Sequence, residues 1–310
     1  MATNNKLLLR FFRNENAPDI PYRHEEVVCF SNNDLEWHHN FIQWIYPTLQ
    51  LSGACQNAPT IDEHFAEQLC ADKCALKNFC KSCQRYLNYM NFDCDGNSHI
   101  VDSTRDQLFY ELPYHNYLRF TRMLDSLNQT GHKQCSKAVY EKMFEVMSRN
   151  RNAWQLYLRQ DSIKYWRQTQ VGRKCRKIIF HDFDNTLFEP DCIAAINHVI
   201  DETKAEIVIS SSWKIDMSVE DIQRMWKASN LPGIPIDVTP AISRHKGDEI
   251  AAWLTLCPDP CRYVIIDDGQ REQFNTNQYP HLIITNGFFG LTMLLANKAI
   301  DILNNHNNYI

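Results

Sequence analysis

The sequence lacks the features that mark several specialised classes of protein. Its 310 residues include only nine glycines, and no repeat or low-complexity tract occurs, which excludes collagen-like chains and solenoid repeats. No window approaches the roughly 18 uninterrupted apolar residues of a membrane-spanning helix, so we expect no transmembrane segment. The first residues, Met-Ala-Thr-Asn-Asn-Lys, do not resemble a secretory signal peptide.

A strong excess of charge is also missing. The net charge is −5 at neutral pH, which does not favour a strong nonspecific grip on nucleic acid or on an anionic membrane. Twelve cysteines are present without a paired framework. We therefore expect reduced thiols, and a cytoplasmic or other reducing intracellular location. The composition sets no expectation for the oligomeric state.

The chain contains two regions of different periodicity, and its length allows two domains. The part before about Gly172 is rich in aromatic residues at helical spacing, whereas the later part alternates apolar strands with amphipathic helices. Between them, residues 168–177 carry a glycine and four basic residues without apolar periodicity, which is typical of a solvated linker. We predict an α-helical domain at residues 1–170 and an α/β domain at residues 175–310.

The first half is predicted to consist of amphipathic helices. In one of them Trp37, Phe41 and Trp44 recur at helical spacing, and Pro47 ends the run. The predicted helices span residues 6–14, 33–46, 61–90, 114–127, 136–148 and 154–166.

Five cysteines fall in or just after the third of these helices, and two interpretations of them compete. They are Cys70, Cys74, Cys80, Cys83 and Cys94. The spacing Cys80-x-x-Cys83 suits zinc, and Cys70 and Cys74 would share a helical face. No second Cys-x-x-Cys occurs, and free cysteine behaves as a small core hydrophobe. We prefer core packing and keep a zinc site as the alternative.

Several blocks in the first half indicate a family. They are Leu9-Arg10-Phe11-Phe12, Pro18-Asp19, Leu35-Glu36, His39, Phe41, Ile42-Gln43-Trp44, Pro47 and the run His115-Asn116-Tyr117-Leu118-Arg119-Phe120-Thr121-Arg122-Met123-Leu124. Their order resembles the conserved domain of the opioid growth factor receptor over roughly residues 6–168. The resemblance implies a helical domain and supplies no enzymatic motif. We interpret His39 and His115 as holding helix ends or filling polar niches rather than as catalytic groups.

The second half predicts a Rossmann-like parallel sheet with helices on both faces. Predicted strands span residues 178–181, 206–209, 262–266 and 281–285, and predicted helices span 192–204, 218–228, 246–256 and 292–304. Ligands bind beyond the carboxyl ends of the strands in such sheets. Three of these ends carry polar side chains suited to phosphate chemistry, namely Asp182 and Asp184, Ser210 and Ser211, and Asp267 and Asp268.

These strand ends, with Lys246 at the start of a helix, resemble the motifs of the haloacid dehalogenase (HAD) superfamily. The first motif reads Asp182-Phe183-Asp184-Asn185-Thr186. The resemblance implies that Asp182 attacks phosphorus and forms an aspartyl-phosphate. It also implies that Asp184 protonates the leaving group and then activates water.

The same resemblance implies the groups that bind substrate and metal. Phosphate would contact Lys246, Thr186 and Ser210, with Ser211 as the alternative to Ser210. Mg²⁺ prefers hard oxygen ligands, and they would come from Asp182, Asp184, Asp267 and Asp268. Ser210-Ser211-Ser212-Trp213-Lys214, residues 246–254 and Gly290-Leu291-Thr292 resemble the HAD domain of RNA-repair and phage-like proteins.

The sequence therefore predicts a Mg²⁺-dependent phosphomonoester hydrolase. The intervals from Asp182 to Ser210 and from Ser210 to Lys246 leave no room for a large cap domain. An open site suits a phosphorylated macromolecule, either a phosphoprotein or a nucleic-acid end, and the helical half would select it. The alternative is a non-catalytic binding or scaffold module that keeps the HAD fold.

Overall fold

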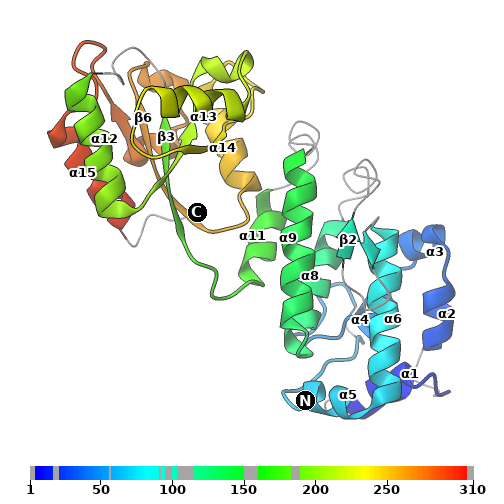
Figure 1. Cartoon of the computed structure of the whole chain (residues 1–310). Coiled ribbons are helices and arrows are strands. Elements are labelled where there is room, and N and C mark those ends of the chain that lie inside the picture. Colours follow the sequence, from blue (N-terminus) through cyan, green and yellow to red (C-terminus); the bar gives the residue numbers. More distant parts are fainter. Residues whose placement is uncertain are drawn as a thin grey trace. The chain divides into compact units, whose positions relative to one another are not determined.

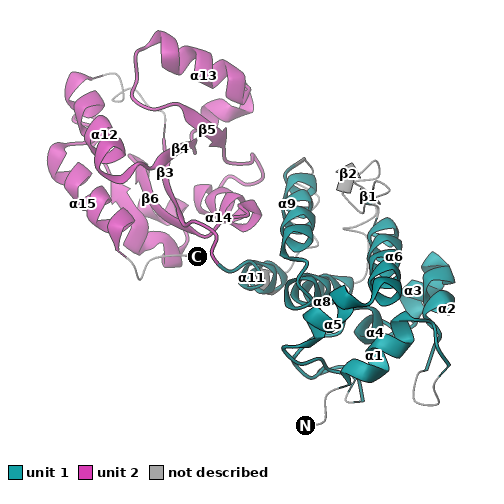
Figure 2. Cartoon of the chain, turned by 60° about the horizontal axis from the view of Figure 1, so that its bottom comes forward, with its two compact units in different colours: residues 1–171 teal, residues 172–310 magenta. Residues whose placement is uncertain are grey.

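The chain forms two compact units, residues 1–171 and 172–310 (Figure 2), in the computed structural model that we describe. The change in sequence periodicity near Gly172 coincides with the border between them. None of the helices in the described ranges is long and apolar enough to cross a membrane. The described residues are 4–16, 21–55, 57–90, 92–94, 100–102, 115–149, 160–182 and 189–305.

The first unit is helical, as predicted (Figure 1). Its core is aromatic, and Tyr86, Tyr117 and Trp166 are among its largest fully buried side chains. The elements are α1 (Asn5–Phe12), α2 (His24–Cys29), α3 (Asn32–Trp37), α4 (Ile42–Ile45), α5 (Phe65–Ala71), α6 (Lys73–Tyr89), β1 (Asp93–Cys94), β2 (Ile100–Asp102), α8 (His115–Gln129), α9 (Lys133–Arg149) and α11 (Gln160–Gln168).

The predicted helix at 33–46 is divided into α3 and α4, because the chain leaves the helical path after Trp37. Helix α3 ends at Trp37, whose side chain is 71% exposed rather than buried. The cause is a distant residue, the buried Arg119 of α8, which donates hydrogen bonds to the Leu35 and His38 carbonyl oxygens at 2.7 Å each. These bonds satisfy backbone acceptors that a continuing helix would have used itself.

The polar network around Arg119 joins the two most specific blocks of the helical unit. The guanidinium also lies 3.2 Å from His39 Nδ1. The neighbouring Glu36 carboxylate lies 2.9 Å from His115 Nε2 and accepts a hydrogen bond of 2.9 Å from Asn116. His115 is therefore partly buried in a polar niche, whereas His39 is exposed and contacts Arg119 from the chain beyond α3.

The predicted helix at 61–90 is also divided. The Asp72 carboxylate accepts hydrogen bonds from the backbone N–H groups of Cys74 and Ala75 at 3.1 and 3.0 Å, which caps α6 and separates it from α5. Cys70 and Cys74 consequently lie on different helices, and both are exposed. Core packing is confirmed for the buried Cys83 and is wrong for Cys70 and Cys74.

The second unit is an α/β fold around a parallel sheet with strand order β5-β4-β3-β6-β7, which confirms the predicted fold class. Its first half comprises β3 (Arg176–His181), α12 (Pro190–Thr203), β4 (Glu206–Ile209), η2 (Ser212–Ile215), α13 (Val219–Ala228) and β5 (Pro235–Val238). Its second half comprises α14 (Lys246–Leu256), β6 (Cys261–Asp267), η3 (Arg271–Gln273), η4 (Thr276–His281), β7 (Leu282–Ile284) and α15 (Met293–Asn304).

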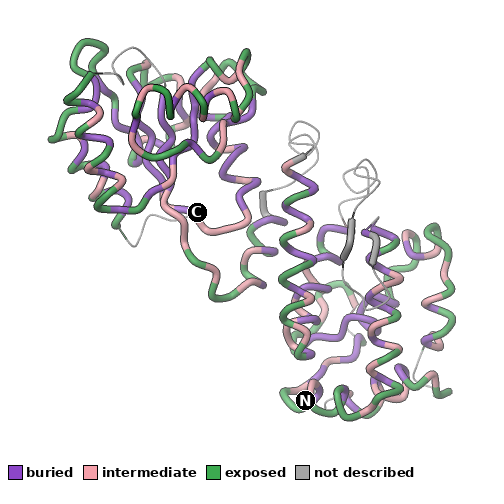
Figure 3. Tube along the Cα trace, in the orientation of Figure 1, coloured by how far each residue is buried: buried purple, intermediate pink, exposed green. Residues whose placement is uncertain are grey.

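The central strands are buried on both faces (Figure 3). Side chains alternate along a strand, so Ile179 packs with α12 and α15 while its neighbours Ile178 and Phe180 pack with α14. Helices therefore cover both faces of the sheet, which leaves the ends of the strands as the place where polar side chains can meet a ligand.

Strand β5 was not among the predicted strands. It has only four residues, begins at Pro235, and lies at the edge of the sheet next to β4. Proline in a strand interior argues against a strand, but the first residue of an edge strand tolerates it. A short edge strand of this kind carries little periodic signal.

His24 makes the stability of the helical unit depend on pH. It is buried, and its Nε2 lies 2.8 Å from both the Asn78 carbonyl oxygen and Ser82 Oγ. Burial lowers the pKa of His24 to about 4. The unfolded chain, with a histidine pKa of about 6.5, binds the proton that the folded chain excludes. The free energy of unfolding should therefore fall as pH drops from 6.5 towards 4, by up to about 1.4 kcal/mol per pH unit.

Urea unfolding of the full chain across this pH range tests the role of His24. His24→Gln should flatten the pH dependence, because glutamine does not titrate. The matched control is His64→Gln, which removes an exposed histidine of the same unit. Equal pH slopes for His24→Gln and the unaltered chain would contradict the assignment.

Candidate functional site

The carboxyl ends of β4, β3 and β6 lie side by side and bring three predicted site residues together. In the parallel register His181 faces Ile209 on one side and Ile266 on the other. Two further backbone hydrogen bonds of 3.0 Å extend this pairing, from Asp182 N to the Ile266 carbonyl and from Ser210 N to the His181 carbonyl. Asp182, Ser210 and Asp267 are therefore neighbours at one sheet edge, as their positions after apolar strands predicted.

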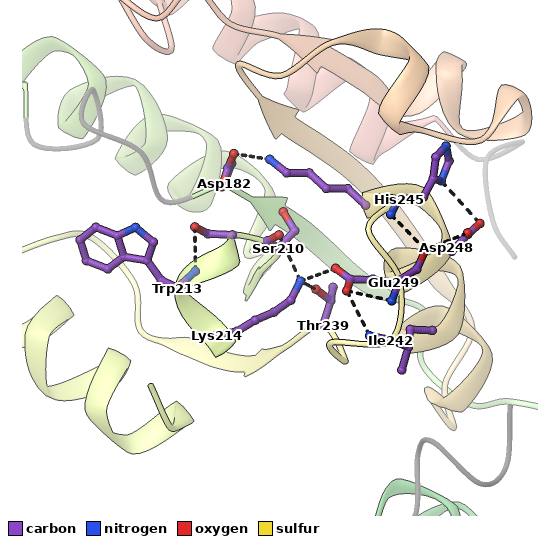
Figure 4. Close-up of polar contacts among 12 residues, drawn as sticks. Asp182, Ser210, Trp213, Lys214, Thr239, Ile242, His245, Asp248 and Glu249 are labelled. Carbon is purple, nitrogen blue, oxygen red and sulfur yellow. Dashed lines mark hydrogen bonds and ion pairs between the residues drawn. The ribbon is translucent and has the colours of Figure 1, made fainter. Parts of the chain in front are cut away.

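Lys246, the first residue of α14, joins two of the carboxylates. Its Nζ contacts Asp182 Oδ2 (Figure 4) and lies 2.8 Å from Asp267 Oδ2. Burial raises the pKa of Asp267 to about 6, and the nearby Asp182 carboxylate adds to this, whereas Lys246 opposes it. Burial lowers the pKa of Lys246, but the two carboxylates outweigh it and hold that pKa above its ordinary value. The two carboxylates thus favour the charged ammonium, and Lys246 offsets part of the effect of burial on Asp267.

Asp182, Asp267 and Asp268 form a cluster suited to a hard cation. One carboxylate oxygen from each lies within 4.8 Å of the others. Asp267 also accepts a hydrogen bond of 2.8 Å from Gly269 N. A Cβ at Gly269 would lie 2.7 Å from Asp267 Oδ1, so a larger residue at that position would displace the carboxylate. An all-oxygen donor set of this kind fits Mg²⁺.

Two of the predicted site residues, Asp184 and Thr186, lie outside the described residues. Of the two serines that were alternatives, Ser211 uses its hydroxyl to accept a hydrogen bond from Trp213 N and so caps η2. Ser210 Oγ is buried and has no hydrogen-bond partner among the described residues. A buried hydroxyl without a partner is costly unless a ligand satisfies it, which favours Ser210 for phosphate binding.

A buried ion pair behind the site was not predicted from the sequence. The Lys214 side chain is 3% exposed, and its Nζ contacts the Glu249 carboxylate (Figure 4). The same ammonium donates to the Ser210 carbonyl at 3.3 Å and to Thr239 Oγ1 at 2.7 Å. Lys214 therefore ties the ends of β4 and β5 to α14.

Glu249 extends this tie to the loop between β5 and α14. Its Oε1 accepts hydrogen bonds from the backbone N–H groups of Ile242 and Ser243 at 3.2 and 3.5 Å. Since Glu249 lies one turn beyond Lys246 on α14, the pair holds the helix start that presents Lys246. The sequence did contain a signal, because Glu249 adjoins Ile250 on the apolar face of α14 and a buried charge implies a partner.

The Lys214–Glu249 pair should dominate the local stability of this unit. Lys214→Met leaves a buried carboxylate unpaired, so we expect the free energy of unfolding to fall by about 3–5 kcal/mol. The double variant Lys214→Met/Glu249→Met removes both charges and should recover part of this loss. Denaturant unfolding of both single variants and the double variant gives the coupling energy.

The control for this cycle is Lys204→Met, which removes the exposed partner of a surface pair with Asp201. Its free energy of unfolding should stay within about 0.5 kcal/mol of the unaltered chain. Zero coupling between positions 214 and 249 would show that the pair does not act as a unit.

Comparisons with known proteins match both units. The family described as the HAD domain in Swiss Army Knife RNA repair proteins matches residues 167–295. Opioid growth factor receptor-like protein 1 is 29% identical over 145 residues in Xenopus tropicalis and 31% identical over 135 residues in Mus musculus. These alignments cover 43% and 40% of this chain. They cover only 27% and 28% of the two relatives.

No solved structure gives a significant match to the chain. The opioid growth factor receptor conserved region matches residues 2–192. That match runs through the helical unit and into the start of the α/β unit, where it overlaps the HAD match. The chain therefore belongs to the opioid growth factor receptor conserved-region family, and its second half matches the HAD domain of RNA repair proteins.

Proposed function

We propose that the α/β unit is a Mg²⁺-dependent phosphomonoester hydrolase in which Asp182 is the nucleophile. The observation that carries this proposal is Lys246, held between Asp182 and Asp267 at the carboxyl edge of the sheet. An ammonium in that position pairs with the Asp182 carboxylate and can neutralise phosphate oxygens. The match to a HAD domain supports a phosphatase-like hydrolase.

In the proposed reaction, Asp182 attacks phosphorus and the phosphomonoester bond breaks as the aspartyl-phosphate forms. Asp184 gives its proton to the leaving oxygen and then takes a proton from the water that hydrolyses the intermediate. Lys246, Ser210 Oγ and Thr186 hold phosphate oxygens. Oxygens of Asp182, Asp184, Asp267 and Asp268 would hold Mg²⁺, which would supply positive charge that reduces the repulsion between the nucleophile and the phosphate.

For the substrate, we propose a phosphorylated macromolecule, with a nucleic-acid end preferred to a phosphoprotein. The preference comes from the matched HAD family, which is described by RNA repair. The described residues between β3 and α14 form only the helices and strands that the sheet requires, so the site has no cap there. We place the chain in a reducing compartment such as the cytoplasm, because the cysteines described in the structure form no disulfide.

A second candidate is a binding or scaffold module without turnover. The observation in its favour is the relatives' printed name, which describes a receptor-like protein. A module that only binds has no need for the Asp182–Lys246–Asp267 arrangement or for the third carboxylate of Asp268. We therefore keep hydrolysis as the proposed function.

Replacing the nucleophile tests the reaction directly. Asp182→Asn should lower hydrolysis of p-nitrophenyl phosphate by about three orders of magnitude or more, because an amide does not attack phosphorus. The fold should persist, since asparagine keeps the size and backbone of aspartate. Steady-state kinetics and a circular dichroism spectrum measure the two quantities.

Asp201→Asn is the matched control, because it changes an exposed carboxylate on α12 and should leave turnover unchanged. Chelation with EDTA should remove activity and added Mg²⁺ should restore it. Near-normal turnover by folded Asp182→Asn would eliminate the aspartyl-phosphate mechanism. A folded, unaltered chain with no turnover at all would favour the scaffold candidate.

The helical unit should govern substrate choice rather than chemistry. All the proposed catalytic and phosphate-binding residues lie after Lys177. A fragment of residues 172–310 that is shown to be folded should still hydrolyse p-nitrophenyl phosphate. On a phosphorylated macromolecular substrate its KM should rise by about tenfold or more, because lost contacts bind ground and transition states alike. Loss of small-substrate turnover would instead point to a catalytic group in the helical unit, with His39 and His115 the first candidates.

A further inference from the structure

Three aromatic side chains of the α/β unit face solvent, whereas its other tryptophans, Trp226 and Trp253, are buried. Phe288 is 89% exposed, Phe289 is 72% exposed and Trp213 is 40% exposed. Exposed aromatic side chains that gather around a site are a common feature of binding surfaces. The positions of these three residues relative to the proposed phosphate site indicate what they could bind.

The two phenylalanines belong to a tight turn that adjoins the carboxylate cluster. The turn follows β7, whose extension pairs with the site through a hydrogen bond of 2.8 Å from Thr285 N to the Asp267 carbonyl. Gly287 comes so close to the cluster that a Cβ on it would lie 3.6 Å from Asp268 Oδ2. Phe288 is the next residue, so an exposed aromatic residue belongs to the turn that adjoins the proposed metal site.

Trp213 stands on the other side of the same site. It lies in η2, directly after β4, where its backbone N–H bonds to Ser211 Oγ. Figure 4 shows its ring directed away from Lys214 and Glu249. In the strand order β5-β4-β3-β6-β7, the strands that carry Asp182 and Asp267 lie between β4 and β7. Exposed aromatic residues thus flank the phosphate site on both sides.

We propose that Trp213 on one side and Phe288 with Phe289 on the other stack against unpaired bases beside the terminal phosphate of a single-stranded nucleic acid. This proposal rests on the proposed function. Every base offers a flat π face to an aromatic side chain, and such stacking is the common way to hold single strands. In this arrangement the terminal phosphate would bind at the carboxylates and Lys246, while the adjoining bases would stack on the aromatic residues of the two neighbouring turns.

Charge favours stacking as the main contact and disfavours a phosphopeptide. The chain has a net charge of −5, so attraction along a phosphate backbone contributes little. Phosphopeptide sites use clusters of arginine, but the turn beyond β7 reads Asn286-Gly287-Phe288-Phe289-Gly290 and carries no charge. Its exposed surface offers rings rather than ionic contacts.

The test compares substrates that differ only in their bases. The full chain is assayed on short single-stranded oligonucleotides with a 5′ or 3′ terminal phosphate, and on the same strands with abasic residues at the two terminal positions. We expect kcat/KM to be about five- to a hundredfold higher with bases present. Trp213→Ala and Phe288→Leu/Phe289→Leu should bring this ratio towards one. Trp213→Phe should restore it, because phenylalanine still stacks.

The matched control is Ile234→Ala, which truncates an exposed apolar residue just before β5, at the opposite end of the strands. It should keep both the ratio and the basal activity. A ratio of one in the unaltered chain, or a preference for a phosphoserine peptide, would overturn the stacking proposal while p-nitrophenyl phosphate turnover still supported the proposed function.

Binding to Asp182→Asn separates the two proposals if no substrate is turned over. Fluorescence anisotropy of dye-labelled oligonucleotides needs no reaction, and the base-bearing strand should bind more tightly than its abasic partner. Trp213→Ala in the Asp182→Asn background should abolish that difference. Equal affinities for the two strands would overturn the stacking proposal independently of catalysis.

Discussion

The α/β unit depends on one electrostatic constraint, the repulsion between carboxylates that parallel strands deliver to one edge. Asp182 and Asp267 lie at the ends of the neighbouring strands β3 and β6. Backbone hydrogen bonds fix the register of these strands, so the two carboxylates cannot move apart without breaking the pairing. Lys246 offsets this repulsion from the start of α14. Its own position depends on the Lys214–Glu249 pair, which ties α14 to the ends of β4 and β5. The site thus contains two sets of paired charges. The Lys214–Glu249 pair is buried, so only Lys246 and its two carboxylates are available to a substrate.

The helical unit also contains a cation that binds several oxygen acceptors, but there the acceptors are mainly backbone carbonyl groups. Arg119 binds the carbonyl oxygens of Leu35 and His38, and this turns the chain between α3 and α4. These carbonyl oxygens are neutral, and their hydrogen bonds with Arg119 stabilise the fold. At the sheet edge the acceptors are carboxylates, one of which is the proposed nucleophile. The different partners distinguish Arg119, which binds mainly backbone acceptors, from Lys246, which belongs to the proposed reaction site.

Local patterns in the sequence predicted most of the α/β unit. Strand β4 and helix α14 have the predicted limits, 206–209 and 246–256, because apolar runs and strand-end carboxylates are local signals. The misses have distant causes. The helix break after Trp37 depends on Arg119, some 80 residues further along the chain. The Lys214–Glu249 pair needs the β4–β5 crossover to bring its members together. Periodicity predicts which face of a helix or strand is buried, but it does not predict which charged residue from a distant part of the chain will lie against that face.

An open phosphate site has little to distinguish one monoester from another, because the reacting group is the same in all of them. Selectivity must then come from contacts outside the reacting group, and we propose two separable sources of such contacts. The turns that carry Trp213 and Phe288 belong to the α/β unit and are the proposed contacts for bases that adjoin the phosphate. The helical unit is the proposed source of the other contacts with a long substrate. A truncated chain should therefore keep the preference for bases at the strand end while it loses affinity for a long strand, which separates the two contributions by experiment.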